Sequence, residues 1–417
     1  MYNQIARVFP RRTNATPNDS LAFIGEPDLL TPKYFDEVHI SIAFTYDMPY
    51  AEKFAKVWSE RTNKVLIGGP GTGAKGEAFI AGKYLKFGYT ITSRGCPNKC
   101  LSGDTLVNTI DGNIPIVELV GKEIKVLTRN TEGKPVFANA INIRKIGKND
   151  KLIRIHFDDK SHLDCTPDHL LRKFKNGNQF INPREYNVRT DELKKGDSII
   201  AIINHRVKRI EYLSDMQDTY CLEVPGYDWF FANNIFVHNC WFCNVHDREG
   251  NIRELPIVEG WNVLDDNLLA CSDTHIKAVF DMLANVKKKY HKPIEFTGGF
   301  EAAKLHYWQI EYLEKLKPKQ IFFAYDHDED FHCLYYHAGK ILRDSSLSKN
   351  SLRCYVLCGY DRDTFDKAEK RMRQTIAAGF IPMAMLYRDD KGIYNKDWSK
   401  FQKEWTRPAI MRAKGLI

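Results

Sequence analysis

Four of the ten cysteines fall in two tight clusters that lie far apart in the chain. Cys96 and Cys100 belong to the segment RGCPNKC, and Cys240 and Cys243 open the segment CWFCNV. Without residues 100–239 the clusters would join as CPNKCWFC, a CxxxCxxC motif. Three thiolates at this spacing can ligate three irons of a [4Fe–4S] cluster and leave the fourth iron open to another ligand.

The first residue of the 140-residue insert is suited to breaking a peptide bond. The thiol of Cys100 can attack the preceding carbonyl and convert the Lys99–Cys100 amide into a thioester. Thr166 and His169, three residues apart in the segment CTPDH, can polarise and protonate that amide. The insert therefore carries a nucleophile and candidate acid and hydrogen-bonding groups for one cleavage.

The last residues of the insert, VHNC, are suited to the remaining steps. Cys240 can take over the acyl group by transthioesterification. Asn239, activated beside His238, can cyclise onto its own carbonyl and cut the chain. A sulfur-to-nitrogen shift would then join Lys99 to Cys240 through an ordinary peptide bond.

These motifs resemble the Hint-fold inteins over the whole of residues 100–239. The resemblance includes the opening CLSGDTLV, the TPDH box and the closing YCLEVPGYDWFFANNIFVHN, and the length is similar to mini-inteins. It implies self-excision with no cofactor, with Cys221 at a position where many members carry an aspartate that couples the steps. Asp228 stands where many members carry a histidine that assists asparagine cyclisation, so this departure puts the rate of cyclisation in question.

Two other interpretations of the insert are ordinary structure without chemistry and a Hint domain that cleaves only. Each motif alone is more common as ordinary structure: a core thiol, a turn, and a chance tripeptide. Their joint occurrence in order, at the ends of one insert, favours the splicing interpretation. A Hint domain of the hedgehog type would cleave without ligating, but Asn239 followed by Cys240 argues against it.

The joined flanks resemble the radical-SAM enzymes, with Cys96, Cys240 and Cys243 as the cluster ligands. The segment FTGGFEA (Phe296–Ala302) is similar to the glycine-pair motif of that family, and QIFFAYD and YVLCGYD fall where later strands contact the nucleoside. The resemblance implies a [4Fe–4S] cluster, S-adenosyl-L-methionine, an electron donor for cluster reduction, and a radical reaction on a nucleic acid, peptide or small molecule. The candidate cofactor-binding residues are Phe242, Gly298, Gly299, Glu301, Asp326 and Gly359.

Three weaker interpretations concern metals and nucleotides in the flanks. A zinc-binding module without radical chemistry is the alternative for the joined cysteines, because His246 could supply a fourth ligand. The segment GGPGTGAKG (Gly68–Gly76) lacks the Lys-Ser/Thr end of a phosphate loop and indicates a glycine-rich turn. The region before it resembles a cobalamin-binding half-domain, but without a DxHxxG motif we expect no cofactor there.

The flanks alternate strand and helix patterns, whereas the insert contains only short strand patterns. Expected strands are 38–44, 64–69, 83–93, 294–299, 320–326, 352–360 and 381–388; expected helices are 51–62, 276–290, 308–317, 333–343 and 364–378. Alternation of this kind predicts a parallel α/β sheet or barrel. We therefore expect a short α/β extension at 1–84, a partial (β/α)6 TIM-like barrel at 85–99 plus 240–417, and an all-β Hint domain at 100–239.

Composition sets looser limits. The chain has 417 residues, 43% hydrophobic, 27% charged, with a net charge of +8. These values are ordinary for globular protein, and no run of eighteen apolar residues predicts a membrane span. The first twenty residues lack the apolar stretch of a signal peptide, so we expect a cytoplasmic protein, no membrane partner, and reduced cysteines.

Overall fold

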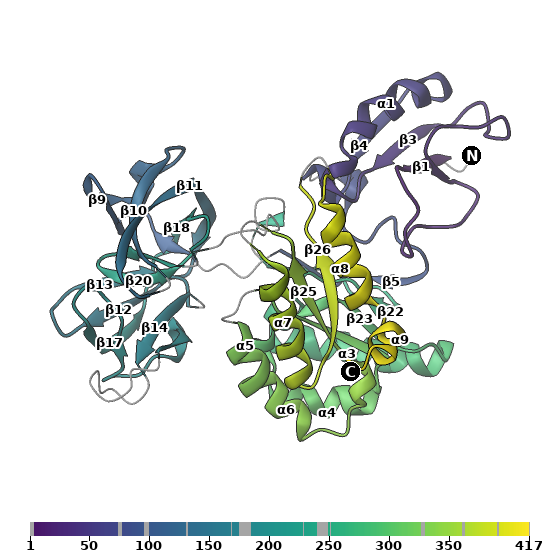
Figure 1. Cartoon of the computed structure of the whole chain (residues 1–417). Helices are drawn as coiled ribbons and strands as arrows, with labels where there is room; N and C mark the ends of the chain where they lie inside the picture. The colour runs from purple at the N-terminus through teal and green to yellow at the C-terminus, as the bar shows by residue number, and fades with distance from the viewer. Residues whose placement is uncertain are drawn as a thin grey trace. The chain divides into compact units, whose positions relative to one another are not determined.

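The computed structural model describes residues 4–73, 77–95, 100–130, 132–167, 169–174, 185–227, 229–239, 249–250, 252–326, 330–360, 363–389 and 392–416. The chain divides into two compact units. One unit combines Met1–Cys96 with Ile252–Ile417, and the other is Pro97–Asn251. Figure 1 shows the strand-rich second unit in blue and teal and the strand–helix first unit in the remaining colours.

The second unit consists of antiparallel strands, as its short strand patterns predict. Its strands are β7 (Leu101–Ser102), β8 (Leu106–Thr109), β9 (Gly112–Pro115), β10 (Ile124–Arg129), β11 (Pro135–Asp150), β12 (Ile153–Phe157), β13 (His162–Cys165), β14 (Leu170–Phe174), β15 (Glu185–Arg189), β16 (Ser198–Ile199), β17 (His205–Tyr212), β18 (Gln217–Glu223), β19 (Trp229–Ala232) and β20 (Ile235–His238). They form one 14-stranded sheet with the path β10-β11-β18-β7-β13-β12-β17-β16-β14-β20-β19-β8-β9, and β15 pairs with β14.

This sheet closes on itself. Strand β10 pairs with β11 on one side and, through Val126 and Thr109, with β8 on the other. Side chains alternate between core and surface, as in β12, where Ile153, Ile155 and Phe157 are buried and the two residues between them are half-buried. Because a shift of one residue would turn these side chains to the other face, the apolar alternation fixes the register of the strands.

The first unit begins with a small parallel sheet. Its strands, in the order β2-β1-β3-β4, are β1 (Ile5–Phe9), β2 (Ala22–Ile24), β3 (Glu37–Ser41) and β4 (Val65–Gly68). Helix α1 (Pro49–Trp58) packs its apolar side on this sheet, with Trp58 fully buried. The glycine-rich turn after β4 fits tightly, because a Cβ on Gly69 would lie 2.6 Å from the carbonyl oxygen of Ile42.

A six-stranded parallel sheet forms the rest of the first unit, in agreement with the strand–helix alternation. Its order is β26-β25-β24-β23-β22-β5. The strands are β5 (Gly88–Thr90), β22 (Gly260–Val263), β23 (Glu295–Phe300), β24 (Gln320–Ala324), β25 (Leu352–Cys358) and β26 (Ile381–Leu386). A two-stranded ladder of β6 (Ser93–Arg94) and β21 (Arg253–Glu254) follows β5. Between the described strands β5 and β26 no pairing closes the sheet into a barrel.

Helices follow the parallel strands: those up to residue 377 connect successive strands, and the last two come after β26. They are α3 (Asp273–Tyr290), α4 (Tyr307–Leu316), α5 (Asp330–His332), α6 (Gly339–Arg343), α7 (Phe365–Ala377), α8 (Lys396–Thr406) and α9 (Pro408–Ala413). The expected helix at 333–343 differs, because its first part, Cys333–Ala338, has π-helical geometry. Side chains of Ser272 and Thr364 accept hydrogen bonds at the starts of α3 and α7, which fixes those ends.

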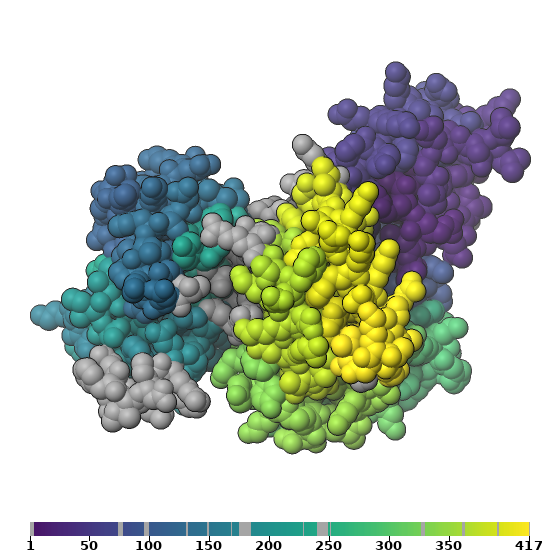
Figure 2. Space-filling view, viewed as in Figure 1, coloured from purple at the N-terminus to yellow at the C-terminus, as the bar shows by residue number. Residues whose placement is uncertain are grey.

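The strand order of this sheet equals its chain order. With right-handed crossovers, that order places the connecting helices on one face and all carboxyl strand ends at one edge. The C-terminal helices α8 and α9 form part of the surface of this unit (Figure 2, yellow). Within the described residues, no helix is both long and apolar enough to cross a lipid bilayer.

Candidate functional site

The first residue of the insert is held between two strands of the closed sheet. Leu101 in β7 pairs with Cys165 in β13 and with Tyr220 in β18. Cys100, one residue earlier, is 1% exposed. Its backbone N–H donates to the Oγ1 atom of Thr166 over 3.1 Å, and its carbonyl accepts from the Thr166 N–H over 2.9 Å. Thr166 therefore forms hydrogen bonds with Cys100 through both its side chain and its backbone.

The hydrogen bond to Oγ1 involves the nitrogen of the Lys99–Cys100 peptide bond. When a sulfur adds to the carbonyl carbon of such a bond, the nitrogen loses its amide resonance and gains a basic lone pair. A threonine hydroxyl has both an acceptor and a donor, so at 3.1 Å Thr166 can hold the N–H first and direct its own hydrogen to the nitrogen afterwards. The geometry suits a group that assists an amine leaving from Cys100.

A tight turn carries the predicted TPDH residues. The N–H of His169 donates to the carbonyl of Thr166 over 3.0 Å, and the imidazole is buried. Thr190 fastens the turn from the side, because its hydroxyl donates to the carbonyls of Thr166 and Pro167, each over 2.9 Å. Asp168, within the predicted motif, lies outside the described residues.

The same turn connects the strands that hold the two ends of the insert. Before it, β13 pairs with β7, and after it, β14 pairs with β20 through Leu171 and Val237. Extending the second pairing by two residues places His169 opposite Asn239, while Thr166 already bonds Cys100. The fold thus brings the start and the end of a 140-residue segment to one short turn.

Asn239 is completely buried at the end of the insert. Its Nδ2 donates to the carbonyl of Tyr227 over 2.8 Å, which fixes the orientation of the side-chain amide because a carbonyl can only accept. Its Oδ1 is buried and has no hydrogen-bond partner among the described atoms. The preceding His238 packs edge-to-face on Trp229, with ring centroids 5.2 Å apart. The hydrogen bond to Tyr227 therefore fixes the side-chain amide of Asn239 in one orientation at the end of the insert.

Cys221, the unusual residue of the predicted motif, also belongs to this site. Tyr220 pairs with Leu101, so the antiparallel register places Cys221 opposite Cys100. The thiol is 4% exposed and donates to the carbonyl of Leu222 over 3.4 Å. Asp228 and Cys240, the other predicted participants, lie outside the described residues.

Some of the residues predicted in the flanks lie within the described parts of the chain, and the others lie outside them. Cys96, Phe242 and Cys243 lie outside the described residues, with Cys240. The other predicted residues follow or end neighbouring strands of the six-stranded sheet: Gly298, Gly299 and Glu301 at β23, Asp326 after β24, and Gly359 after β25. These strands are parallel, so all five residues lie at the carboxyl edge of the sheet, the edge at which β5 also ends.

The two glycines of β23 have different surroundings. A Cβ on Gly298 would lie 1.9 Å from the carbonyl oxygen of Asp265, so its close approach is to the neighbouring backbone, whereas the sequence suggested approach to a ligand. Gly299 has φ +141° and open space where a Cβ would be. Only Gly299 therefore leaves room for a bound molecule at this motif.

The remaining edge residues already have protein contacts. Glu301 accepts from the side-chain amide of Asn267 over 2.8 Å. Asp326 accepts from the N–H of Leu357 over 3.1 Å and so ties β24 to β25. Gly359 has φ +78°, and a Cβ there would lie 2.9 Å from the Trp398 ring, so turn geometry alone requires this glycine.

Sequence reasoning missed a pair of carboxylates beside this edge. Asp265 and Asp266 follow β22, and both bond to the segment just before Cys96. An acidic pair directly after a buried strand pattern, GWNVLDD, was the available signal. It also missed Tyr227 and Thr190, which act through common backbone and hydroxyl contacts that carry no motif.

Residues 1–99 and 240–417, which flank the insert, are called the host. The described cysteines of the host behave as structural thiols. Cys354 and Cys358 are fully buried, while Cys333 is only half-buried. Burial raises the pKa of Cys354 well above its usual range, that of Cys358 to about 12 and that of Cys271 to about 11. Thiols held protonated in this way make poor nucleophiles at neutral pH.

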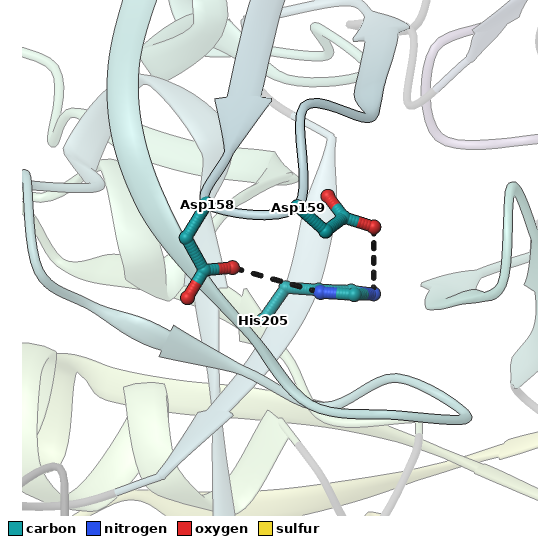
Figure 3. Close-up of side chains that lie close together, drawn as sticks. All are labelled: Asp158, Asp159 and His205. Carbon is teal, nitrogen blue, oxygen red and sulfur yellow. Dashed lines mark ion pairs between the residues drawn. The ribbon is translucent and has the colours of Figure 1, made fainter.

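One cluster of side chains on the surface of the insert consists of residue types that can bind a metal ion. Figure 3 shows His205 between Asp158 and Asp159, with its two ring nitrogens 3.6 and 3.4 Å from their carboxylates. Burial raises the pKa of Asp159, but hydrogen bonds from Ser161 and the charge of His205 outweigh it, so that pKa lies below its usual value. The carboxylates also accept from the backbone N–H groups of Arg206 and Ser161, so the group is explained as an ion-paired turn.

Comparison with known proteins gives likenesses to part of the chain. No protein-family model matches it. A DNA polymerase of Thermococcus aggregans is 28% identical over 120 residues, so the chain spans 6% of the length of that curated relative.

Among solved structures, a DnaB intein from Synechocystis sp. PCC 6803 is 20% identical with a TM-score of 0.30, and the match covers 34% of this chain and 98% of that one. For the gp41-1 intein these values are 24%, 0.26, 34% and 98%, and for the TvoVMA intein 26%, 0.29, 34% and 98%. The chain is similar to inteins over 34% of its length.

Proposed function

We propose that residues 100–239 are an intein that excises itself and joins Lys99 to Cys240. The observation that carries this proposal is the hydrogen bond between the Cys100 N–H and Thr166 Oγ1, on the nitrogen of the bond to be broken. Two features support it: the insert's first and last residues are both buried, and the pairings of β13 and β14 bring them to one turn.

The first step forms one bond and breaks one. The Cys100 thiol gives up its proton as its sulfur adds to the Lys99 carbonyl carbon. The carbon–nitrogen bond breaks and the departing amine of Cys100 takes one proton, so the number of protons is unchanged. Thr166 stands at that nitrogen, and His169 is the proposed source of the proton. The Cys240 thiol then displaces the Cys100 thiol from the acyl carbon, which leaves the number of thioesters unchanged.

The second cleavage uses the buried amide of Asn239. Its Nδ2 adds to its own backbone carbonyl carbon, and the nitrogen of Cys240 departs with a proton, so the insert ends in a cyclic imide. The hydrogen bond to the Tyr227 carbonyl holds the side-chain amide in one orientation while Nδ2 reacts, and the proton that Nδ2 loses balances the one that the Cys240 nitrogen gains. The free amine of Cys240 finally displaces its own sulfur and forms the peptide bond with Lys99.

Trapping the thioester tests this proposal. In the Asn239→Ala, Cys240→Ala chain only the first step can proceed, so hydroxylamine should release residues 1–99 as a hydroxamate. The matched chain that also carries Cys100→Ala should release nothing. Equal release from both chains, or none from either, would overturn the proposal.

For the joined host we propose a radical-SAM enzyme of a partial (β/α)6 barrel type, with Cys96, Cys240 and Cys243 holding a [4Fe–4S] cluster. When bound and reduced, such a cluster supplies the electron that cleaves S-adenosyl-L-methionine to a radical. The chain's own residues support this choice: Gly299 offers space and Glu301 a carboxylate at the edge toward which β5 leads. The substrate would be bound at the same edge.

Metal and sulfide analysis separates this proposal from a zinc module. The joined host is expressed from a gene that lacks residues 100–239, because Cys240→Ala would block splicing of the precursor. After anaerobic reconstitution it should contain about four irons and four sulfides per chain, and each single Cys→Ala change at 96, 240 or 243 should lower both. The Cys333→Ala chain should keep them. One zinc per chain with no sulfide would favour the zinc-binding alternative.

A further inference from the structure

The host segment before the insert is integrated into the sheet formed by the segment after it. Strand β5 pairs in parallel with β22, and Thr90 at its end donates to the carbonyl of Val258 over 2.8 Å. Beyond it, Arg94 in β6 pairs with Arg253 in β21. Residues on the two sides of the insert are therefore direct neighbours within one unit.

Asp265, from the later segment, binds the earlier segment at its last buried residues. The carboxylate is 2% exposed and accepts from the N–H of Thr92 over 2.6 Å, from the Thr92 hydroxyl over 2.6 Å and from the Ser93 hydroxyl over 2.7 Å. All three donors come from residues that precede the insert. Burial raises the pKa of Asp265 above its usual value, which shows how far this group is removed from water.

Asp266 forms further hydrogen bonds with the earlier segment, up to Gly95, which precedes Cys96 in the sequence. One carboxylate oxygen accepts from the guanidinium of Arg94 over 2.5 Å, and the other accepts from the Gly95 N–H over 3.1 Å. Arg94 and Asp266 are both largely shielded from water. Consecutive carboxylates thus hold every residue from Thr92 to Gly95.

Separation of the two host segments would break all five hydrogen bonds that Asp265 and Asp266 accept from residues 92–95. Phe87 adds an apolar contact across the same boundary, with its ring 5.2 Å from that of Trp261. The association is therefore specified by several independent interactions.

We propose that the two host segments, residues 1–99 and 240–417, form a complex that does not need a covalent link between them. Asp265 and Asp266 are the positioning residues, and their hydrogen bonds to Thr92–Gly95 are called the lock. This inference deepens the proposed splicing function, on which its test rests. These contacts hold the chain up to Gly95 in place while the insert reacts, so residues 1–99 would stay bound to the later segment even if the thioester were cleaved.

The same arrangement sets the base of the loop that the spliced host will carry. After excision, 18 residues (95–99 and 240–252) separate Arg94 from Arg253, and they contain all three proposed cluster thiols. The β6–β21 pair that closes this loop is already formed in the unspliced chain. Excision then shortens a loop whose two ends are already fixed.

The experiment cleaves the precursor and asks whether the host stays together. A full chain with Asn239→Ala and Cys240→Ala is treated with 2-mercaptoethanesulfonate, which exchanges with the Lys99 thioester and frees residues 1–99 from residues 100–417. In native gel filtration the two fragments should elute together, and in denaturant they should elute apart. Separate elution in native buffer after complete cleavage would overturn the inference.

Variants locate the lock. Asp265→Asn with Asp266→Asn should let most of the cleaved 1–99 fragment elute separately, while Asp281→Asn, an exposed acid on α3, should not. The cleavage rate by thiol should be the same in all three chains, and far-UV circular dichroism before cleavage should match. If the double variant holds its fragment as firmly as the control, the two carboxylates are not the lock.

Failure of the splicing proposal has a different signature. If thiol releases no fragment from any chain, the thioester does not form and the proposed function fails, whatever the state of the host. Restoring Asp266 alone in the double variant should recover part of the co-elution, because the Arg94 and Gly95 contacts return. Recovery of this kind distinguishes positioning from general loss of folding.

Discussion

The two units place their reactive ends in different ways. In the all-β unit, antiparallel pairing buries Cys100 and Asn239 and holds them at one turn through local hydrogen bonds. In the strand–helix unit, the candidate residues follow successive parallel strands and share one edge of the sheet. The first arrangement suits a reaction of the chain on itself, and the second suits binding of a separate molecule.

The two units should also differ in how they respond to single substitutions. The insert's chemistry depends on few atoms, so single substitutions there should stop particular steps. The host depends on a broad set of contacts around β5 and β22, so its response to single changes should be graded. Substitutions can separate the loss of single steps in the insert from the graded response of the host.

Removal of the nucleophile should have the largest effect. Cys100→Ala lacks the sulfur that opens the Lys99 peptide bond, so ligation should fall below detection. Cys333→Ala, which removes a half-buried host thiol, should splice normally. Densitometry of product bands over a day checks both, and ligated product from the Cys100 variant would break the assignment of the first step.

Removal of the second nucleophile should stop the reaction part-way. Asn239→Ala has no side-chain amide to cyclise, so cleavage before Cys240 should disappear while the thioester at the first junction still forms. Mass spectrometry of thiol-treated and untreated samples distinguishes the two junctions. Loss of reactivity at both junctions would indicate that Asn239 is needed for the fold of the site.

Thr166 should affect the rate without being essential. Thr166→Val keeps the shape but loses the hydroxyl bonded to the Cys100 nitrogen, and we expect the first step to slow by about 10²-fold. Thr166→Ser restores an oxygen and should recover most of the rate. Timed hydroxylamine release in the Asn239→Ala background measures this step, and equal rates for Val and Ser would contradict the role of Oγ1.

The host thiols should respond only to high pH. With a pKa of about 11, Cys271 is protonated at pH 8, so it should react with iodoacetamide about two orders of magnitude more slowly than glutathione. The raised pKa of about 12 at Cys358 means the folded host keeps a proton that the unfolded chain loses. The unfolding free energy should therefore decline as pH rises from about 9 through about 12. Fast alkylation of Cys271 at pH 8 would contradict this environment.

Sequence patterns were most informative where chemistry needs particular residue types. Cys100, the TPDH residues and Asn239 could be chosen because few other side chains perform these steps, and the short strand patterns predicted the all-β character of the insert. The parallel sheet also followed from strand–helix alternation, although helix starts differed, as at Asp273 where the helix was expected to begin at Ile276.

Other features depend on contacts that sequence does not reveal. Gly298 was expected to admit a ligand, but only the packed sheet shows that it accommodates the Asp265 backbone. Asp265 and Asp266 gain their importance from Thr92 to Gly95, which are more than 160 residues away. The π-helical turn at Cys333–Ala338 likewise has no pattern that distinguishes it from ordinary helix.

The most direct test is the intact mass of the full chain after expression and purification under reducing conditions. We predict two species, the joined flanks with Lys99 bonded to Cys240 and a free 140-residue domain that ends in a cyclic imide. A single species at the full 48.3 kDa, with Cys100 and Asn239 unchanged, would contradict the account.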